Sequence, residues 1–266
     1  MRFPSFVLSF VFAVSLASAA AETPTEPDPR AILGRLQQRL ETVVGVLSEE
    51  AQTAADRISA ADVAEEDTRS VLKDLCGALD YSVDCAYIDA RGVMVYIEPE
   101  DYRAHEGKDI SGQEHFARLR ETGLPVFSGV FRAVEGFDAL DYEHPVSASD
   151  GKWQGSVSVL MKPADFIALA LGPEMDGLPY EVMVMQTDGL VLYGDEKEIG
   201  RRVFTDPMYK DFPSLLELCG RVVKEETGEG TYIFTGKKTD RPREKKAYWT
   251  TANAGDHAWR LLLIVE

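Results

Sequence analysis

The apolar positions between residues 29 and 80 recur with the period of an α-helix. Asp28-Pro29 is a typical helix start, because Asp caps free backbone N–H groups and Pro fits the first turn. One apolar stripe then follows at spacings of three and four, made of Leu33, Leu36, Leu40, Val43 and Leu47. The acidic stretch 62–67 interrupts it, and a shorter stripe follows at residues 71–79. The pattern therefore predicts a long helix and a second, shorter one within residues 29–80.

From residue 83 onward the pattern changes to short apolar runs separated by turn residues, which is typical of β-strands. The expected strands are 83–88, 93–97, 126–131, 141–147 and 153–161, then 180–185, 190–193, 231–235, 245–251 and 259–265. Helices are expected at 113–121, 164–171 and 213–226, with a break at Gly172-Pro173.

Three short motifs of the first strand series recur in the same order about 100 residues later, as in an internal repeat. Residues 89–92 match 186–189, residues 120–123 match 225–228, and residues 126–129 match 233–236. The predicted fold class is α+β: a long N-terminal helix and two copies of one module, residues 81–172 and 173–266. Each copy is expected to be a five-stranded antiparallel sheet with flanking helices.

This layout resembles the double-Cache (PDC, PAS-like) extracytoplasmic sensor domain. The residues that carry the resemblance are Asp28-Pro29, 89–92, 125–131, 144–146, 155–160, 204–207, 247–251 and 259–265. The resemblance implies that the membrane-distal module, residues 81–172 by chain order, binds the ligand, and that residues 173–266 form the membrane-proximal module. The Tyr, Arg, Trp-Tyr and Asp pattern of the amino-acid-binding branch is not found. Since no output module follows Glu266, the resemblance implies a separate membrane receptor or signalling partner.

The N-terminus has the order of a secretory signal. Arg2 supplies a positive charge, residues 3–16 are mostly apolar, and residues 17–21 are small. We expect residues 1–21 to be a signal peptide and residues 22–28 a linker. An uncleaved membrane anchor is the alternative. Either way the protein is expected outside the cytoplasm, periplasmic or secreted.

Composition narrows the classes of function. The net charge of −17 argues against nucleic acid as a partner, because phosphate binding needs clustered Lys and Arg. Cys76 and Cys85 could pair, but the favoured interpretation makes these two and Cys219 small buried hydrophobes. The four histidines lack metal-ligand spacing, and no catalytic motif is found. We therefore expect no enzyme activity, no catalytic residues, no metal and no cofactor.

The first module offers more mixed polar and aromatic residues for a pocket than the second. Phe127 and Phe131 are expected on one strand face, and Tyr142 and His144 on one face of the next strand. Arg103 or Arg132 would hold a carboxylate through the guanidinium fork. The complete set of expected ligand-binding residues is Tyr102, Arg103, Gln113, His115, Phe127, Phe131, Arg132, Tyr142 and His144.

The expected function is binding or sensing of a small molecule, a small organic acid or a related metabolite. One alternative is a non-catalytic interaction module with a vestigial pocket that acts through its long helix on a membrane partner. Another is an exported enzyme. The stripe of the long helix is too apolar to stay exposed, so it packs on the modules or pairs with the same helix in a homodimer.

Overall fold

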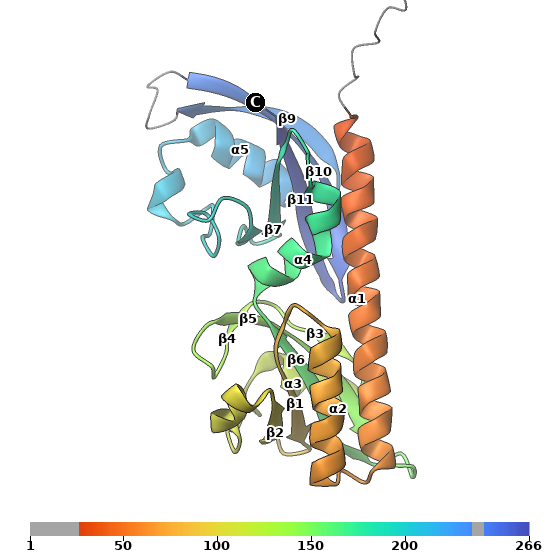
Figure 1. Cartoon of the computed structure of the whole chain (residues 1–266). Helices are drawn as coiled ribbons and strands as arrows, with labels where there is room; N and C mark the ends of the chain where they lie inside the picture. The colour runs from red at the N-terminus through yellow and green to blue at the C-terminus, as the bar shows by residue number, and fades with distance from the viewer. Residues whose placement is uncertain (1–26, 236–241, 266) are drawn as a thin grey trace, which may run out of the picture.

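A computed structural model describes residues 27–235 and 242–265. Two antiparallel sheets lie one beyond the other along a single long helix, α1 (Pro29–Ala60), as Figure 1 shows. The expected signal peptide and most of the linker lie outside the described residues. Within these ranges, no helix is both long and apolar enough to cross a membrane.

The N-terminal helices confirm the pattern of residues 29–80. Asp28 caps α1 by accepting the Arg30 backbone N–H, and Pro29 occupies its first turn. The acidic stretch ends α1 as expected: Asp62 and Val63 take positive φ angles, and α2 (Glu65–Ala78) starts just beyond them. The shorter helix lies beside α1 and packs against the first sheet (Figure 1).

The first sheet has the strand order β2-β1-β6-β5-β3, with β4 paired to β5. Its strands are β1 (Ser82–Asp89), β2 (Met94–Glu98), β3 (Val126–Phe127), β4 (Phe131–Arg132), β5 (Asp138–Ser147) and β6 (Trp153–Met161). A 3-10 helix, η1 (Glu100–His105), and helix α3 (Glu114–Thr122) form the crossover between β2 and β3.

The second sheet has the order β8-β7-β11-β10-β9, which repeats the order of the first. Its strands are β7 (Glu181–Gln186), β8 (Val191–Tyr193), β9 (Gly228–Thr235), β10 (Pro242–Ala254) and β11 (His257–Val265). The crossover contains η2 (Pro207–Tyr209) and α5 (Pro213–Val222). The predicted α+β fold with two similar modules is confirmed.

One apolar core joins α1 to both sheets. Leu36, Leu40 and Leu47 of α1 are buried, and the helix contacts β5 and β6 of the first sheet and β10 and β11 of the second. Helix α4 (Pro163–Met175) fills the space between the modules, where Phe166 packs on Phe127 and Trp259. The stripe of α1 is thus covered within the chain, and the alternative of a homodimer through this helix stays a prediction.

Helix α4 ends later than expected, at Met175, with Gly172 and Pro173 inside its last turn. Proline lacks a backbone N–H, so it removes one hydrogen bond of the helix. In the last turn this loss is tolerated, because no further turns depend on it.

A bulge divides the strand expected at residues 126–131. Phe127 pairs with Tyr142, whereas Phe131 pairs with Ala139, so one extra residue enters this side of the ladder. Since a slip of one residue reverses the faces of a strand, Phe127 and Phe131 point to opposite sides of the sheet. The expectation that they share a face is wrong.

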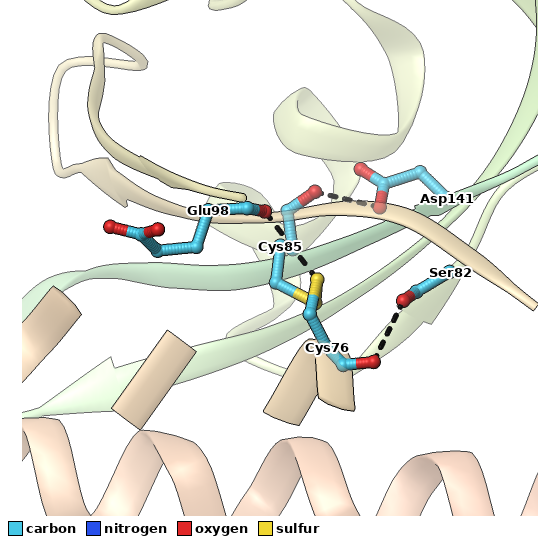
Figure 2. The surroundings of a disulfide bond; sticks show 6 residues. Cys76, Ser82, Cys85, Glu98 and Asp141 are labelled. Atoms are coloured by element: carbon cyan, nitrogen blue, oxygen red, sulfur yellow. Dashed lines mark hydrogen bonds between the residues drawn. A yellow bond between two sulfur atoms is a disulfide. The ribbon is translucent and has the colours of Figure 1, made fainter. Parts of the chain in front are cut away.

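The first module contains a disulfide. Cys76 at the end of α2 is bonded to Cys85 in β1, and the Ser82 hydroxyl donates a hydrogen bond to the Cys76 carbonyl (Figure 2). The favoured interpretation of both cysteines as free hydrophobes is therefore wrong, because the turn after α2 brings them within bonding distance. Cys219 is free and buried, as expected.

Candidate functional site

A small cavity lies on the face of the first sheet that η1 and α3 cover. Its volume is about 20 Å³, which accommodates one water-sized group. Its apolar lining comes from Ile88, Met94, Ile110, Phe131, Val134 and Leu160. Its polar lining comes from Asp84, Gln113, Glu135, Asp141 and Ser158.

The strand register brings the acidic residues of this face together. Asp84 of β1 and Asp141 of β5 both pair with Leu160 of β6, so the three form one row across the sheet. In the next row, Ser158 of β6 stands between Ala86 and Glu143. Since directly opposed residues face the same side of a sheet, Asp84, Asp141 and Glu143 gather on the covered face.

Asp84 is a buried carboxyl with no hydrogen bond to its side chain among the residues that the structure describes. It is 1% exposed, and both of its oxygens lack a partner there. Burial, followed by the nearby carboxyls of Glu135 and Asp141, raises the pKa of Asp84 well above its usual range. The pKa of Glu135 is raised by burial as well. Burial thus favours the neutral, protonated form of these acids, and a positive charge placed beside them would favour the ionised form.

Two serine hydroxyls hold the carboxyls of β5. Ser158 donates to Asp141 Oδ1 at 2.8 Å, and Ser156 donates to Glu143 Oε2 at 3.0 Å. Burial and the neighbouring Asp141 raise the pKa of Glu143 well above its usual range. Ser128, inside the bulge, accepts the Asp141 backbone N–H and so fixes this part of β5.

His115 of α3 lies against the carboxyl groups of Asp141 and Glu143. Its Nε2 lies 3.4 Å from Asp141 Oδ2 and 3.4 Å from Glu143 Oε1, but within residues 27–235 and 242–265 neither Nε2 nor Oε1 has a hydrogen-bond partner. The Phe131 ring packs on the imidazole at 4.5 Å between ring centres. Three buried polar side chains thus converge on one point.

Four of the expected residues lie at this face. Gln113 and Phe131 line the cavity, His115 belongs to the acidic cluster, and Tyr102 packs on the apolar residues beside it. Burial and the nearby Asp84 raise the pKa of Tyr102.

Neither expected arginine reaches the cavity lining. Arg103 pairs with the buried Glu98 at 2.5 Å, next to Arg69, which binds Glu106 at 2.7 Å. Arg132 is 67% exposed and pairs with Asp138 at 3.2 Å. Among the described residues that line the cavity, none is Arg or Lys. A carboxylate would therefore meet buried acids here and no lining cation.

The other three expected residues lie on the opposite face of the sheet. The Tyr142 hydroxyl is 2.7 Å from the Ser48 hydroxyl of α1, and Phe127 is part of the core between the modules. His144 shares the Tyr142 face, and burial lowers its pKa. These three residues do not line the cavity.

The sequence reasoning missed the acidic set. Asp141 and Glu143 alternate with Tyr142 and His144, so the period of two could have selected either pair. Asp84, a charged residue within the apolar run 83–88, was the stronger signal.

Part of the chain is similar in sequence to a family of sensor domains. Residues 42–163 match the family described as HK/GC/Chemotaxis protein-like, sensor domain. No curated protein is significantly similar to the chain in sequence.

Solved structures share the fold over nearly the whole chain. An extracellular ligand binding receptor from Desulfohalobium retbaense is 30% identical with a TM-score of 0.74, over 90% of this chain and 40% of the receptor. This chain thus spans less than half the length of that receptor. The sensory domain of the Campylobacter jejuni chemoreceptor Tlp3 (CcmL) is 11% identical with a TM-score of 0.64, over 89% of this chain and 91% of that domain. The periplasmic sensory domain of the C. jejuni chemoreceptor Tlp1 is 11% identical with a TM-score of 0.57, over 89% of this chain and 93% of that domain.

The repeated strand order, the long helix along both sheets and these similarities agree. The chain has the fold of double-Cache sensor domains, and its residues 42–163 match a family of sensor domains.

Proposed function

We propose that this protein is an extracytoplasmic sensor or binding module whose first sheet holds a small molecule through a protonated amine. Asp84 carries the proposal: it is a buried carboxyl at a cavity with apolar and polar lining, and its two oxygens have no hydrogen-bond partner in the described part of the chain. An ionised carboxylate in such a place is costly unless a positive group accompanies it. An ammonium group has roughly the size of the water that the cavity accommodates.

The organic acid expected from the sequence fits this face less well, because the expected arginines are paired elsewhere. Structures of the Tlp3 domain in complex with L-norvaline and with isoleucine give a precedent for amine-bearing ligands in this fold. Binding, and not catalysis, is the proposed activity, because the family that residues 42–163 match is one of sensor domains.

The location of the protein also belongs to the proposal. The N-terminal sequence has the order of a signal peptide, and a disulfide is typical of an oxidising compartment outside the cytoplasm. The start of α1 and the end of β11 lie at the same end of the molecule, beside the second sheet (Figure 1). A membrane attached at the N-terminus would thus leave the first module as the distal one.

The proposed ligand class can be tested by comparing matched compounds. Each of a series of primary alkylamines is paired with the alcohol and the carboxylic acid of the same length, and α-amino acids are added. Thermal melting of the purified protein should rise with amines and stay unchanged with the matched alcohols and acids. Stabilisation by the acids alone would contradict the proposal. Fractionation of expressing cells should find the protein outside the cytoplasm.

A further inference from the structure

We propose that His115, Asp141 and Glu143 form a binding site for a first-row divalent transition-metal ion, for which Zn²⁺ is the probe. The three residues each offer one ligand atom, and these atoms all lie within 4.8 Å of one another. This site adjoins the cavity proposed for the amine and shares Asp141 with its lining, but Asp84, which carries that proposal, is not among the three ligands.

The distances suit a metal better than they suit direct hydrogen bonds. Two ligand atoms that are each about 2.1 Å from a tetrahedral Zn²⁺ lie about 3.4 Å from each other. His115 Nε2 is 3.4 Å from Asp141 Oδ2 and 3.4 Å from Glu143 Oε1. Neither Nε2 nor Oε1 has a hydrogen-bond partner. Small movements of the three side chains would place one ion between them.

The burial of these three side chains also favours a bound cation. The side chains of His115, Asp141 and Glu143 are 4%, 3% and 0% exposed. Buried charges are normally paired or bound to a metal. A divalent ion would neutralise both carboxylates and would also bind the His115 nitrogen. A proton shared by the two carboxyl groups would instead leave that nitrogen without a partner.

Hydrogen bonds from neighbouring serines hold the two carboxylates in place, as they do around the ligands of metal sites. The carboxylate oxygens that point away from the cluster, Asp141 Oδ1 and Glu143 Oε2, accept hydrogen bonds from Ser158 and Ser156. Such outer contacts fix the orientation of the ligating oxygens. The Phe131 ring fixes the imidazole plane in a similar way.

The donor set indicates the class of ion. Imidazole suits Zn²⁺, Fe²⁺, Ni²⁺ and Cu²⁺, whereas Mg²⁺ and Ca²⁺ prefer oxygen alone. One nitrogen and two carboxylate oxygens therefore favour a transition metal. Three protein ligands leave a fourth position for water. The spacing rule applied to the sequence missed this set, because its ligands come from α3 and β5 and not from one helix.

The test is metal binding by the full chain, purified without a histidine tag and stripped with a chelator. Competition against a chromophoric chelator measures the Zn²⁺ affinity, and the visible spectrum of the Co²⁺ form reports its coordination. We expect one ion per chain. Glu143→Gln and His115→Gln should weaken Zn²⁺ binding roughly a hundredfold or more. Replacing a residue that only orients a metal ligand already lowers metal affinity by about 10–100-fold, and these two residues are ligands themselves. Ser156→Ala should weaken it about tenfold.

Glu198→Gln is the matched control, because Glu198 is a partly buried carboxyl of the second module whose pKa is raised by burial. It should keep the full affinity. Circular dichroism establishes that each variant is folded, and if Glu143→Gln is not, Ser156→Ala and the Co²⁺ spectrum decide. The proposal is overturned by a wild-type chain that binds no stoichiometric ion, or by equal affinity in the wild type and all folded cluster variants. Amine binding that survives such a result would leave the proposed function standing.

Discussion

Glu143 of the first sheet and Trp249 of the second occupy the same position in two sheets of identical strand order. Glu143 pairs with Ser158, which pairs with Ala86, whereas Trp249 pairs with Leu262, which pairs with Met183. In the second module the indole fills the face that α5 covers, and a Cβ at Gly228 would come within 2.2 Å of it. The two copies thus use one framework for an acidic face and for an apolar core.

This difference predicts opposite responses to substitution. Trp249→Ala should lower the free energy of unfolding by about 3–5 kcal/mol, because it empties a buried aromatic site. Glu143→Gln keeps the shape of the side chain and removes a buried charge, so its unfolding free energy should stay close to that of the wild type or rise. Urea unfolding measures both. A loss in Glu143→Gln as large as that in Trp249→Ala would show that the acidic face is a structural core.

Asp84 should make stability depend on pH. Its pKa is raised in the folded protein, so between the ordinary Asp pKa of about 4 and the raised value the folded chain holds a proton that the unfolded chain has lost. The free energy of unfolding therefore falls as pH rises through this window, and the loss is complete above the raised pKa. Asp84→Asn should remove this contribution, and above the window should raise the melting temperature by about 2–4 °C for each kcal/mol recovered.

The comparison needs metal-free protein and thermal melts from pH 4 to 9. Asp138→Asn is the control, because Asp138 is an exposed carboxyl in β5 of the same sheet. If the melting temperatures of the wild type and Asp84→Asn differed by the same amount at every pH in this range, the raised pKa of Asp84 would be contradicted.

The stripe of α1 predicts a strong asymmetry between the two sides of the helix. Leu40 is buried in the core, whereas Val46 is 46% exposed on the same helix. Leu40→Asp should cost more than the roughly 2–5 kcal/mol typical of Leu→Ala, since it also buries a charge. Val46→Asp should change the unfolding free energy by no more than about 0.5 kcal/mol. Equal effects in denaturant unfolding would mean that α1 is not docked on the sheets as described.

The disulfide predicts a redox-sensitive melting temperature. Cys76 and Cys85 are 9 residues apart, and closing a loop of this length stabilises a protein by about 2–3 kcal/mol in the chain-entropy model. Dithiothreitol should lower the melting temperature of the wild type by roughly 5–10 °C. It should leave Cys76→Ser unchanged, and a similar response in both proteins would argue against the bond.

The sequence was informative where one physical preference dominates. Leu36, Leu40 and Leu47 recur with the helical period because α1 buries one face only, and the repeat is visible because both modules need turns at the same places, such as residues 89–92 and 186–189. These signals depend on neighbouring positions along the chain, so they can be recognised without knowing which elements pack together.

The site was harder to predict because both faces of β5 are buried. Tyr142 faces α1 and its hydroxyl is hydrogen-bonded to that of Ser48, whereas Asp141 and Glu143 face α3. The alternation of residues along β5 therefore indicates two buried faces but does not indicate which of them binds a ligand. The bulge after Phe127 then reverses the face of Phe131. A tertiary register of this kind depends on which strands pair, and the pattern along the chain does not contain it.

The central claim, that the first sheet binds a cationic ligand at Asp84, is tested most directly by titration calorimetry with the tightest-binding amine from the matched series. The variants are Asp84→Asn and Glu181→Gln, because Glu181 is the counterpart of Asp84 in the second sheet: it pairs with Ile264, which pairs with Ala247. A lost charge-assisted hydrogen bond of about 1.5–3 kcal/mol corresponds to a weakening of about tenfold to a hundredfold. The account predicts that weakening in Asp84→Asn and an unchanged Kd in Glu181→Gln. Full affinity in Asp84→Asn, or a loss confined to Glu181→Gln, would contradict it.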